Sequence, residues 1–208
     1  MVLDEKGIKA VSELLEPVNA PVELLFFVSD DAKHCDTVEE LLNDLKSLEK
    51  IEFDKLKIDS DQGKKLGVGH HAPTIVFKDM PRIRITGVPS GHEFRGFLET
   101  ILMVSKGETN LSNDVKKELA KITENVFIQV FVTPTCPYCA PMVFSAHQFA
   151  LENKHITSRM VEAVEFPDLV KTNQVSGVPK VVINDMVDKS FEGNVPEHIF
   201  VKKILESL

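Results

Sequence analysis

The feature that most constrains how this chain can fold is an internal repeat. Pro73, with the apolar residues after it, returns as Pro179 at an offset of about 106 residues, again before an apolar segment. Upstream, the apolar run 22–28 matches the run 126–132. Because a repeat with a fixed period marks copies of one structural unit, the 208 residues are interpreted as two copies of a unit of about 100 residues.

Both copies show the same order of expected elements: a helix, a strand, a helix, a strand, a short helix, two strands and a closing helix. In the first copy these elements are expected at about 6–15, 22–28, 36–50, 53–59, 61–66, 73–77, 83–86 and 93–106. In the second copy they are expected at about 114–123, 126–132, 137–153, 157–163, 168–173, 180–184, 188–192 and 197–207. This order predicts the α/β class, with a four-stranded mixed sheet flanked by helices in each unit.

The predicted units are residues 1–108 and 109–208. The turn-rich stretch 106–110 between them is too short for a flexible linker, so the units are expected to pack into one body. Hydrophobic residues make up 43% of the chain and charged residues 27%, which is typical of a soluble globular protein. The formal net charge of −8 argues against nucleic acid or an anionic membrane as a partner.

The compartment is predicted from the N-terminal segment, the apolar runs and the cysteines. Residues 1–6 lack the basic stretch and apolar core of a secretory signal, and no apolar run approaches the ~20 residues of a membrane helix. The chain has three cysteines, an odd number that does not suit a structural disulfide framework. We therefore expect a cytoplasmic protein that uses cysteine chemistry.

The strongest chemical signal is Cys136-Pro137-Tyr138-Cys139, which follows the expected strand 126–132 and opens the next expected helix. Two intervening residues at a helix N-terminus bring the two sulfurs close enough to bond, and the helix dipole favours a thiolate on the first cysteine. Cys136 is therefore expected to be the exposed attacking thiolate and Cys139 the buried resolving thiol. Pro137 suits the first turn of a helix. The predicted redox centre is this cysteine pair itself, with no bound cofactor.

Two alternatives to redox chemistry are a zinc half-site and a pair of unrelated buried cysteines. A structural zinc site usually needs four ligands, and the second half of the chain has no second CxxC and no nearby pair of histidines. His147 would lie about 12 Å along the helix from Cys139, too far to join a site there. The strand, the CxxC and the downstream Pro179 together favour redox chemistry.

With these motifs the whole chain resembles the protein disulfide oxidoreductases of thermophilic prokaryotes, which consist of two fused thioredoxin folds. Cys-Pro-Tyr-Cys is similar to the glutaredoxin motif, and Gly177-Val178-Pro179 matches the thioredoxin-superfamily loop before the cis-proline. The resemblance implies a cis peptide bond before Pro179, with the Val178 backbone beside the disulfide to pair with a substrate strand. It implies the same for Pro73, and it places Pro137 and Tyr138 among the substrate-binding residues. The alternative for either cis-proline position is a simple turn that starts a strand.

The first copy departs from that family because Ala32 stands where the second copy has Cys136. Cys35 aligns with Cys139, so the first unit cannot close an internal disulfide. Three interpretations of Cys35 remain: a partly buried thiol in a structural and substrate-binding unit, a mixed or intermolecular disulfide, and a metal site. The metal site would hold zinc or copper. Its candidate ligands are His34, Cys35, His70 and His71.

Two features of related sites are missing from the sequence. Thioredoxins carry a buried acid on the strand before the CxxC, but residues 127–132 contain no carboxylate, so the sequence identifies no general base. The glutathione-binding Gly-Gly-x-Asp pattern of glutaredoxins is also absent after Pro179, which argues against glutathione as the dedicated reductant.

The resulting prediction is a protein disulfide oxidoreductase of the reductase or isomerase type. Its partners would be protein disulfides and a flavoprotein resembling thioredoxin reductase. One alternative is an electron relay to a peroxiredoxin. The N-terminal module of the bacterial flavoprotein that reduces alkyl-hydroperoxide peroxiredoxins also has two thioredoxin folds, with CxxC only in the second. The sequence also leaves open a substrate-binding or chaperone-like module and a metal carrier.

Overall fold

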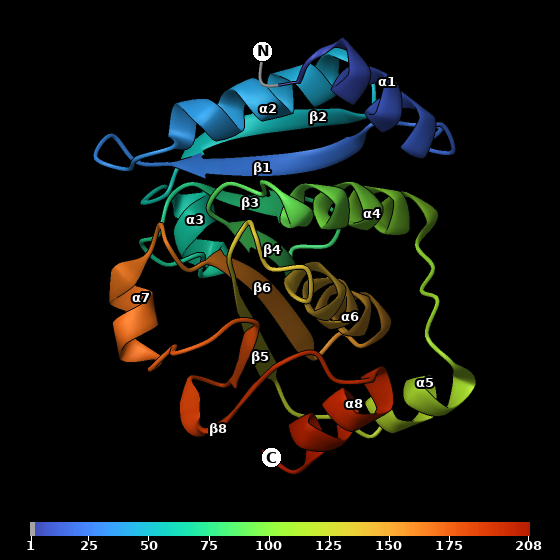
Figure 1. Cartoon of the computed structure of the whole chain (residues 1–208), viewed down its shortest axis with the longest axis vertical. Helices are drawn as coiled ribbons and strands as arrows, with labels where there is room; N and C mark the ends of the chain where they lie inside the picture. The colour runs from blue at the N-terminus through green and yellow to red at the C-terminus, as the bar shows by residue number, and fades with distance from the viewer. Residues whose placement is uncertain (1–2) are drawn as a thin grey trace.

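Eight strands form one continuous sheet in the order β2-β1-β3-β4-β6-β5-β7-β8 (Figure 1). The structure is a computed structural model that describes residues 3–208, so residues 1 and 2 of the N-terminal segment considered above lie outside the described residues. The first unit contains α1 (Glu5–Leu14), β1 (Val22–Val28), α2 (Cys35–Ser47), β2 (Ile51–Lys57), α3 (Asp61–Leu66), β3 (Thr74–Phe77), β4 (Ile83–Thr86) and α4 (His92–Lys106). The second contains α5 (Asn113–Leu119), β5 (Val126–Val132), α6 (Cys139–Glu152), β6 (Ile156–Glu162), α7 (Pro167–Thr172), β7 (Lys180–Ile183), β8 (Met186–Glu192) and α8 (Glu197–Leu205).

The α/β class, the element order and the four mixed strands of each repeat are confirmed, and several element ends are corrected. The predicted helix 36–50 ends at Ser47, and the next strand starts at Ile51 in place of 53, because Glu49 turns the chain with a φ of 57°. The predicted helix 114–123 ends at Leu119. Strand β8 starts at Met186 in place of 188, because positive φ angles at Asn184 and Asp185 form a two-residue hairpin turn.

The two repeats are joined through the strands β4 and β6, which pair in parallel from Ile83↔Ser158 to Thr86↔Val161. Within each repeat the first strand is parallel to the second and antiparallel to the third, which is antiparallel to the fourth. It follows that β1, β4, β5 and β6 run in one direction. The loop after β1, which leads to Cys35, and the loop after β5, which carries Cys136, therefore lie at the same end of the strands.

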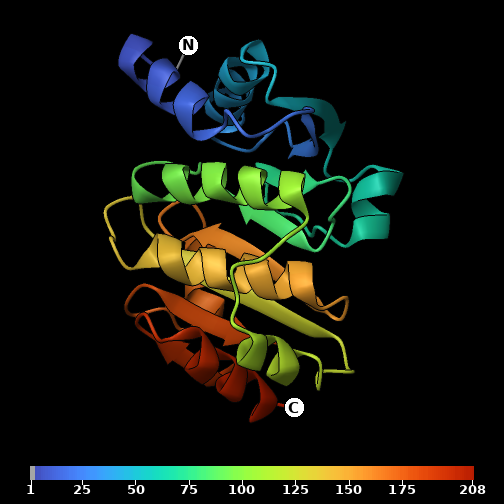
Figure 2. The ribbon, with the colours of Figure 1, turned by 90° about the vertical axis from the view of Figure 1, so that its right-hand side faces the viewer.

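Helices α4 and α6 pack side by side on one face of the sheet, while α3 and α7 lie on the other (Figures 1 and 2). One hydrophobic cluster runs through both repeats, with Phe77 against Phe97 in the first and Phe149 against Phe200 in the second. A smaller cluster under α7 contains Phe131, Val161, Phe166 and Val182. Among residues 3–208, no helix combines the length and apolar character that a membrane crossing requires.

Candidate active site

The loop that carries the candidate nucleophile leaves the end of β5 in a tight turn. The Cys136 N–H donates to the Thr133 carbonyl at 3.1 Å, which places Pro134 at the second position of a four-residue turn, where proline is favoured. The Cys139 N–H then donates to the Cys136 carbonyl at 3.4 Å. Because this is an i→i+3 bond, the chain enters α6 through a second tight turn. Helix α6 therefore begins at Cys139, and the prediction of a helix from residue 137 is wrong.

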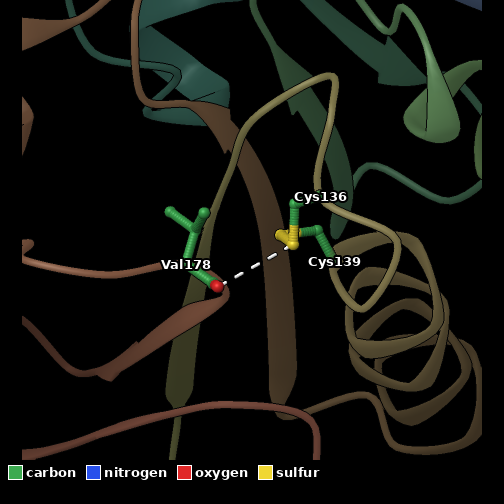
Figure 3. Close-up of a disulfide and its surroundings, with 3 residues drawn as sticks. All are labelled: Cys136, Cys139 and Val178. Carbon is green, nitrogen blue, oxygen red and sulfur yellow. Dashed lines mark hydrogen bonds between the residues drawn. A yellow bond between two sulfur atoms is a disulfide. The ribbon is translucent and has the colours of Figure 1, made fainter.

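Cys136 and Cys139 form a disulfide with their Cα atoms 5.5 Å apart (Figure 3). Cys139 is fully buried, as expected for a resolving cysteine. Cys136 was expected to be exposed, but it is only 9% exposed, because the loop before β7 stands beside it. Tyr138, between the two cysteines, is 64% exposed. Within the CxxC, solvent therefore reaches Cys136 slightly and Tyr138 freely, but not Cys139.

Both predicted cis peptide bonds are present, before Pro73 and before Pro179. The Val178 carbonyl oxygen lies 3.8 Å from the Cys136 sulfur (Figure 3). Pro179, the residue before β7, is buried, whereas Val178 is half-buried. A disulfide sulfur carries no proton, so this carbonyl becomes a hydrogen-bond acceptor for the Cys136 thiol only in the reduced pair.

Residues 127–132 contain no carboxylate that could act as a general base, but the first unit contributes a buried acidic residue. Glu93 is in the first turn of α4, is 2% exposed, and both its carboxylate oxygens lack a hydrogen-bond partner among the described residues. Burial raises its pKa to about 8. The sequence signal was a carboxylate on the apolar stripe of helix 93–106, four residues before Phe97. A group that titrates near neutral pH is suited to general acid–base work.

Two contacts of α4 with the chain on either side of the cysteine pair flank Glu93. The preceding residue, His92, donates its N–H to the Pro134 carbonyl at 3.0 Å, in the turn that leads to Cys136. One turn later, a Cβ on Gly96 would lie 3.4 Å from the Cβ of Ala140, the residue after Cys139. Glu93 thus lies, along α4, between a residue that contacts the loop before Cys136 and one that faces the residue after Cys139.

The corresponding loop of the first unit holds a buried thiol and no disulfide. Cys35 is the first residue of α2, as Cys139 is of α6, and its sulfur lies 4.0 Å from the Ser29 carbonyl oxygen. Burial raises the pKa of the Cys35 thiol above its ordinary value. Cys35, together with Ala32, lines a cavity of about 580 Å³. A thiol with a raised pKa is a poor nucleophile at neutral pH.

The structure does not gather the four candidate metal ligands into one cluster. His70 and His71 line a second cavity of about 510 Å³, which His34 shares but Cys35 does not. His71 instead contacts the Asp168 carboxylate of the second unit, with its Nε2 2.7 Å from Oδ2. Across the described residues, no group of three or more His, Cys, Asp or Glu side chains is arranged to hold a metal ion.

Known proteins with similar sequences or folds include thiol–disulfide redox proteins. Residues 126–206 match the thioredoxin domain family. The crystal structure of a protein disulfide oxidoreductase from Aeropyrum pernix is 28% identical, with a TM-score of 0.88 over 98% of this chain and 93% of that one. A structure of the F subunit of alkyl hydroperoxide reductase from Enterococcus faecalis, 22% identical, has a TM-score of 0.86 over 98% of this chain and 100% of that one.

Among curated sequences, the F subunit of alkyl hydroperoxide reductase from Pseudomonas aeruginosa is 26% identical over 83% of this chain. The chain spans 32% of the length of that relative. An NADH dehydrogenase from Bacillus subtilis is 24% identical over 49% of the chain and 20% of its own length. The chain thus consists of two thioredoxin-like repeats, the second of which matches the thioredoxin domain family in sequence, and it resembles thiol–disulfide redox proteins over its whole length.

Proposed function

We propose that this protein is a thiol–disulfide oxidoreductase that exchanges the Cys136–Cys139 dithiol with disulfides of other proteins. The observation that carries the proposal is the Cys136 sulfur beside the Val178 carbonyl at 3.8 Å, in a CxxC whose Tyr138 is exposed. An extended substrate segment can pair with the Val178 backbone there, which brings its disulfide to Cys136. Pro137 and Pro179 form the remaining walls of the proposed substrate site.

The reaction proceeds in two exchange steps. The Cys136 thiolate attacks one sulfur of the substrate disulfide, so that the substrate S–S bond breaks, a mixed disulfide forms and one substrate thiolate leaves. Glu93 then takes the proton of Cys139, and the resulting thiolate attacks the Cys136 sulfur. The second substrate thiolate leaves, and the Cys136–Cys139 disulfide remains. The substrate gains two electrons and the cysteine pair loses two.

The electrons that restore the dithiol would come from a flavoprotein resembling thioredoxin reductase, and the chain itself would need no bound cofactor. We place the reaction in the cytoplasm, where reduced thiols such as Cys35 persist. The test is a redox titration of the intact protein in glutathione and dithiothreitol buffers, trapped by alkylation and read by mass. A two-thiol step at Cys136 and Cys139, together with insulin reduction, supports the proposal, whereas the absence of that step contradicts it.

A relay of electrons to a peroxiredoxin is the second candidate. It is favoured by the presence of CxxC in only the second repeat and by the 26% identity to the F subunit of alkyl hydroperoxide reductase. Turnover of insulin and of a peroxiredoxin, measured with the same reductase, separates the two. Reduction of both substrates supports the general enzyme, and reduction of the peroxiredoxin alone supports the relay.

A further inference from the structure

The loop between β5 and α6 (residues 133–138), called here the redox loop, belongs to the second unit. It is in contact with the N-terminus of α4, a helix of the first unit. Gly91 precedes the first residue of α4 with φ 58° and ψ −126°, a conformation that is essentially restricted to glycine. A Cβ at this position would overlap the Pro134 carbonyl oxygen and lie 2.9 Å from the carbonyl carbon. The absence of a side chain at Gly91 therefore permits the helix end to touch the redox loop.

The contact includes a specific hydrogen bond. The His92 N–H is one of the free donors at the start of α4, and it donates to the Pro134 carbonyl at 3.0 Å. That carbonyl belongs to the central peptide of the turn that ends with the bond from Cys136 N–H to Thr133 O. The central peptide of a four-residue turn can face either way, which is the difference between turn types I and II. The His92 N–H holds it in one orientation.

We infer that Gly91 and the backbone N–H of His92 are positioning elements for the attacking sulfur: the first unit, which has no cysteine pair of its own, fixes the turn that presents Cys136. The inference rests on the proposed function. It concerns residues that do not touch the reacting sulfurs and act through Pro134. The Cys136 sulfur is two residues beyond that carbonyl, so a rotation of the turn moves it relative to the Val178 oxygen 3.8 Å away.

The same contact affects the charge state of Cys136. The N-terminus of a helix carries a partial positive charge, and α4, with 15 residues, brings that charge to the redox loop. A thiolate at Cys136 is therefore favoured by two helix ends, that of α6 in its own unit and that of α4 in the first. The Glu93 carboxylate in the first turn of α4 opposes it once that group ionises, at a pH of about 8, and the variants compared below leave Glu93 in place. When the α4 contact is lost, the thiolate becomes less favourable and the oxidised pair gains relative to the reduced pair.

The decisive test compares His92→Pro with His92→Ala in the full chain. Both substitutions remove the exposed imidazole, but only proline removes the N–H. Proline is tolerated at the first position of a helix, and the residue before it, Gly91, has no Cβ to clash with the proline ring. Relative to His92→Ala, we expect His92→Pro to reduce insulin about five-fold more slowly, since a hydrogen bond contributes ~1 kcal/mol. The equilibrium with glutathione should move about five-fold toward the disulfide.

The pH dependence of Cys136 alkylation is the readout that a merely structural change would not move. In the reduced protein, the midpoint of alkylation at Cys136 should be higher in His92→Pro than in His92→Ala. This measurement needs no substrate, so it decides the inference even if insulin is not reduced and the proposed function fails. Identical alkylation midpoints and identical glutathione equilibria in the two variants would overturn the inference.

A second pair of variants covers the case in which His92→Pro does not fold. Gly107 ends the same helix with a φ of 65°, and a Cβ there would meet nothing within 4 Å. Gly91→Ala and Gly107→Ala both place alanine at a positive φ, but only Gly91→Ala pushes on Pro134. We expect the Cys136 midpoint to rise in Gly91→Ala and not in Gly107→Ala. An equal midpoint in both variants would reject the positioning role.

Discussion

The two loops that follow β1 and β5 share their first turn and differ in what comes after it. The Ala32 N–H donates to the Ser29 carbonyl at 3.2 Å, as the Cys136 N–H donates to that of Thr133 at 3.1 Å. The backbone then diverges: His34 has a φ of 67°, whereas Tyr138 at the matching position has a φ of −94°. The first unit thus lacks both the attacking cysteine and the backbone path that joins a CxxC.

The position of each repeat in the sheet explains a further difference. The first unit joins the second through β4 and β6, which places α4 of the first unit against α6 of the second. On its other side, the first unit ends at β2, which is an edge strand of the sheet. Within residues 3–208, no other unit therefore supplies an equivalent of α4 to the loop after β1. When two repeats are joined in this order, only the loop after β5 can contact an acidic residue (Glu93) and a helix N-terminus (that of α4) from the other repeat. The proposed redox site is in the repeat that has these contacts with a neighbouring unit.

Replacement of the attacking cysteine should have the largest effect. Cys136→Ser removes the nucleophile of the first exchange step, and we expect disulfide reduction to be abolished, because the Cys35 thiol is buried and its pKa is raised. Insulin reduction with a fixed reductase is the measurement. Cys139→Ser is the matched variant, and it should trap a mixed disulfide with substrate. Retained turnover in Cys136→Ser would refute the assignment of the site to the second repeat.

Replacement of the buried acid should slow the second exchange step. We expect Glu93→Gln to reduce turnover about 10²-fold at neutral pH, the lower end of the range for a general base. Glu99→Gln, at the half-buried Glu99 of the same helix that pairs with Arg95, is the control. Stopped-flow decay of the mixed disulfide measures the step directly. Equal decay rates in the two variants would remove Glu93 from the mechanism.

Glu93 should also make stability depend on pH in a defined direction. Its folded pKa of about 8 is above the ordinary value of 4.5, so the unfolded chain loses this proton first as the pH rises. The contribution of Glu93 to the free energy of unfolding is complete below about pH 4.5 and declines as the pH rises to about 8. Between these values, Glu93→Gln should gain stability relative to the parent as the pH rises. If denaturation gives the same difference in free energy of unfolding between Glu93→Gln and the parent at pH 5 and at pH 8, the pKa of about 8 is contradicted.

The sequence was sufficient to predict what each repeat contains. Strands such as 22–28 and 126–132 are long apolar runs, and Pro73 and Pro179 stand before strands in a matching context, so local pattern was enough. It was not sufficient for the contacts between the repeats. The alternation Ile83, Arg84, Ile85 is the same for an edge strand and for one that pairs with β6. Glu93 was missed for the same reason, because its proposed role depends on a helix of the other unit.

Adding a cysteine at position 32, to match Cys136, should have a smaller effect than replacing Cys136 or Glu93. Ala32→Cys supplies the second thiol, but the left-handed His34 lies between the two positions, and a disulfide tolerates a limited range of Cα separations. We expect the single variant to bridge incompletely in glutathione buffers that fully oxidise Cys136–Cys139. The double variant Ala32→Cys with His34→Tyr should bridge further. Mass spectrometry after alkylation measures both, and complete bridging in the single variant would show that the backbone is no obstacle.

Loss of the remaining cysteine should have the smallest effect of all. Cys35→Ser changes a buried thiol at the start of α2 that has no partner cysteine, so we expect turnover near that of the parent and a loss of ~1 kcal/mol in the free energy of unfolding. In the parent, the raised pKa of Cys35 predicts slower alkylation than at Cys136 at neutral pH. A large fall in turnover with unchanged stability would instead give Cys35 a redox role, through a mixed or intermolecular disulfide. Because this variant leaves α4 and its contact with Pro134 untouched, it separates the thiol of the first unit from the support that the first unit gives to the second.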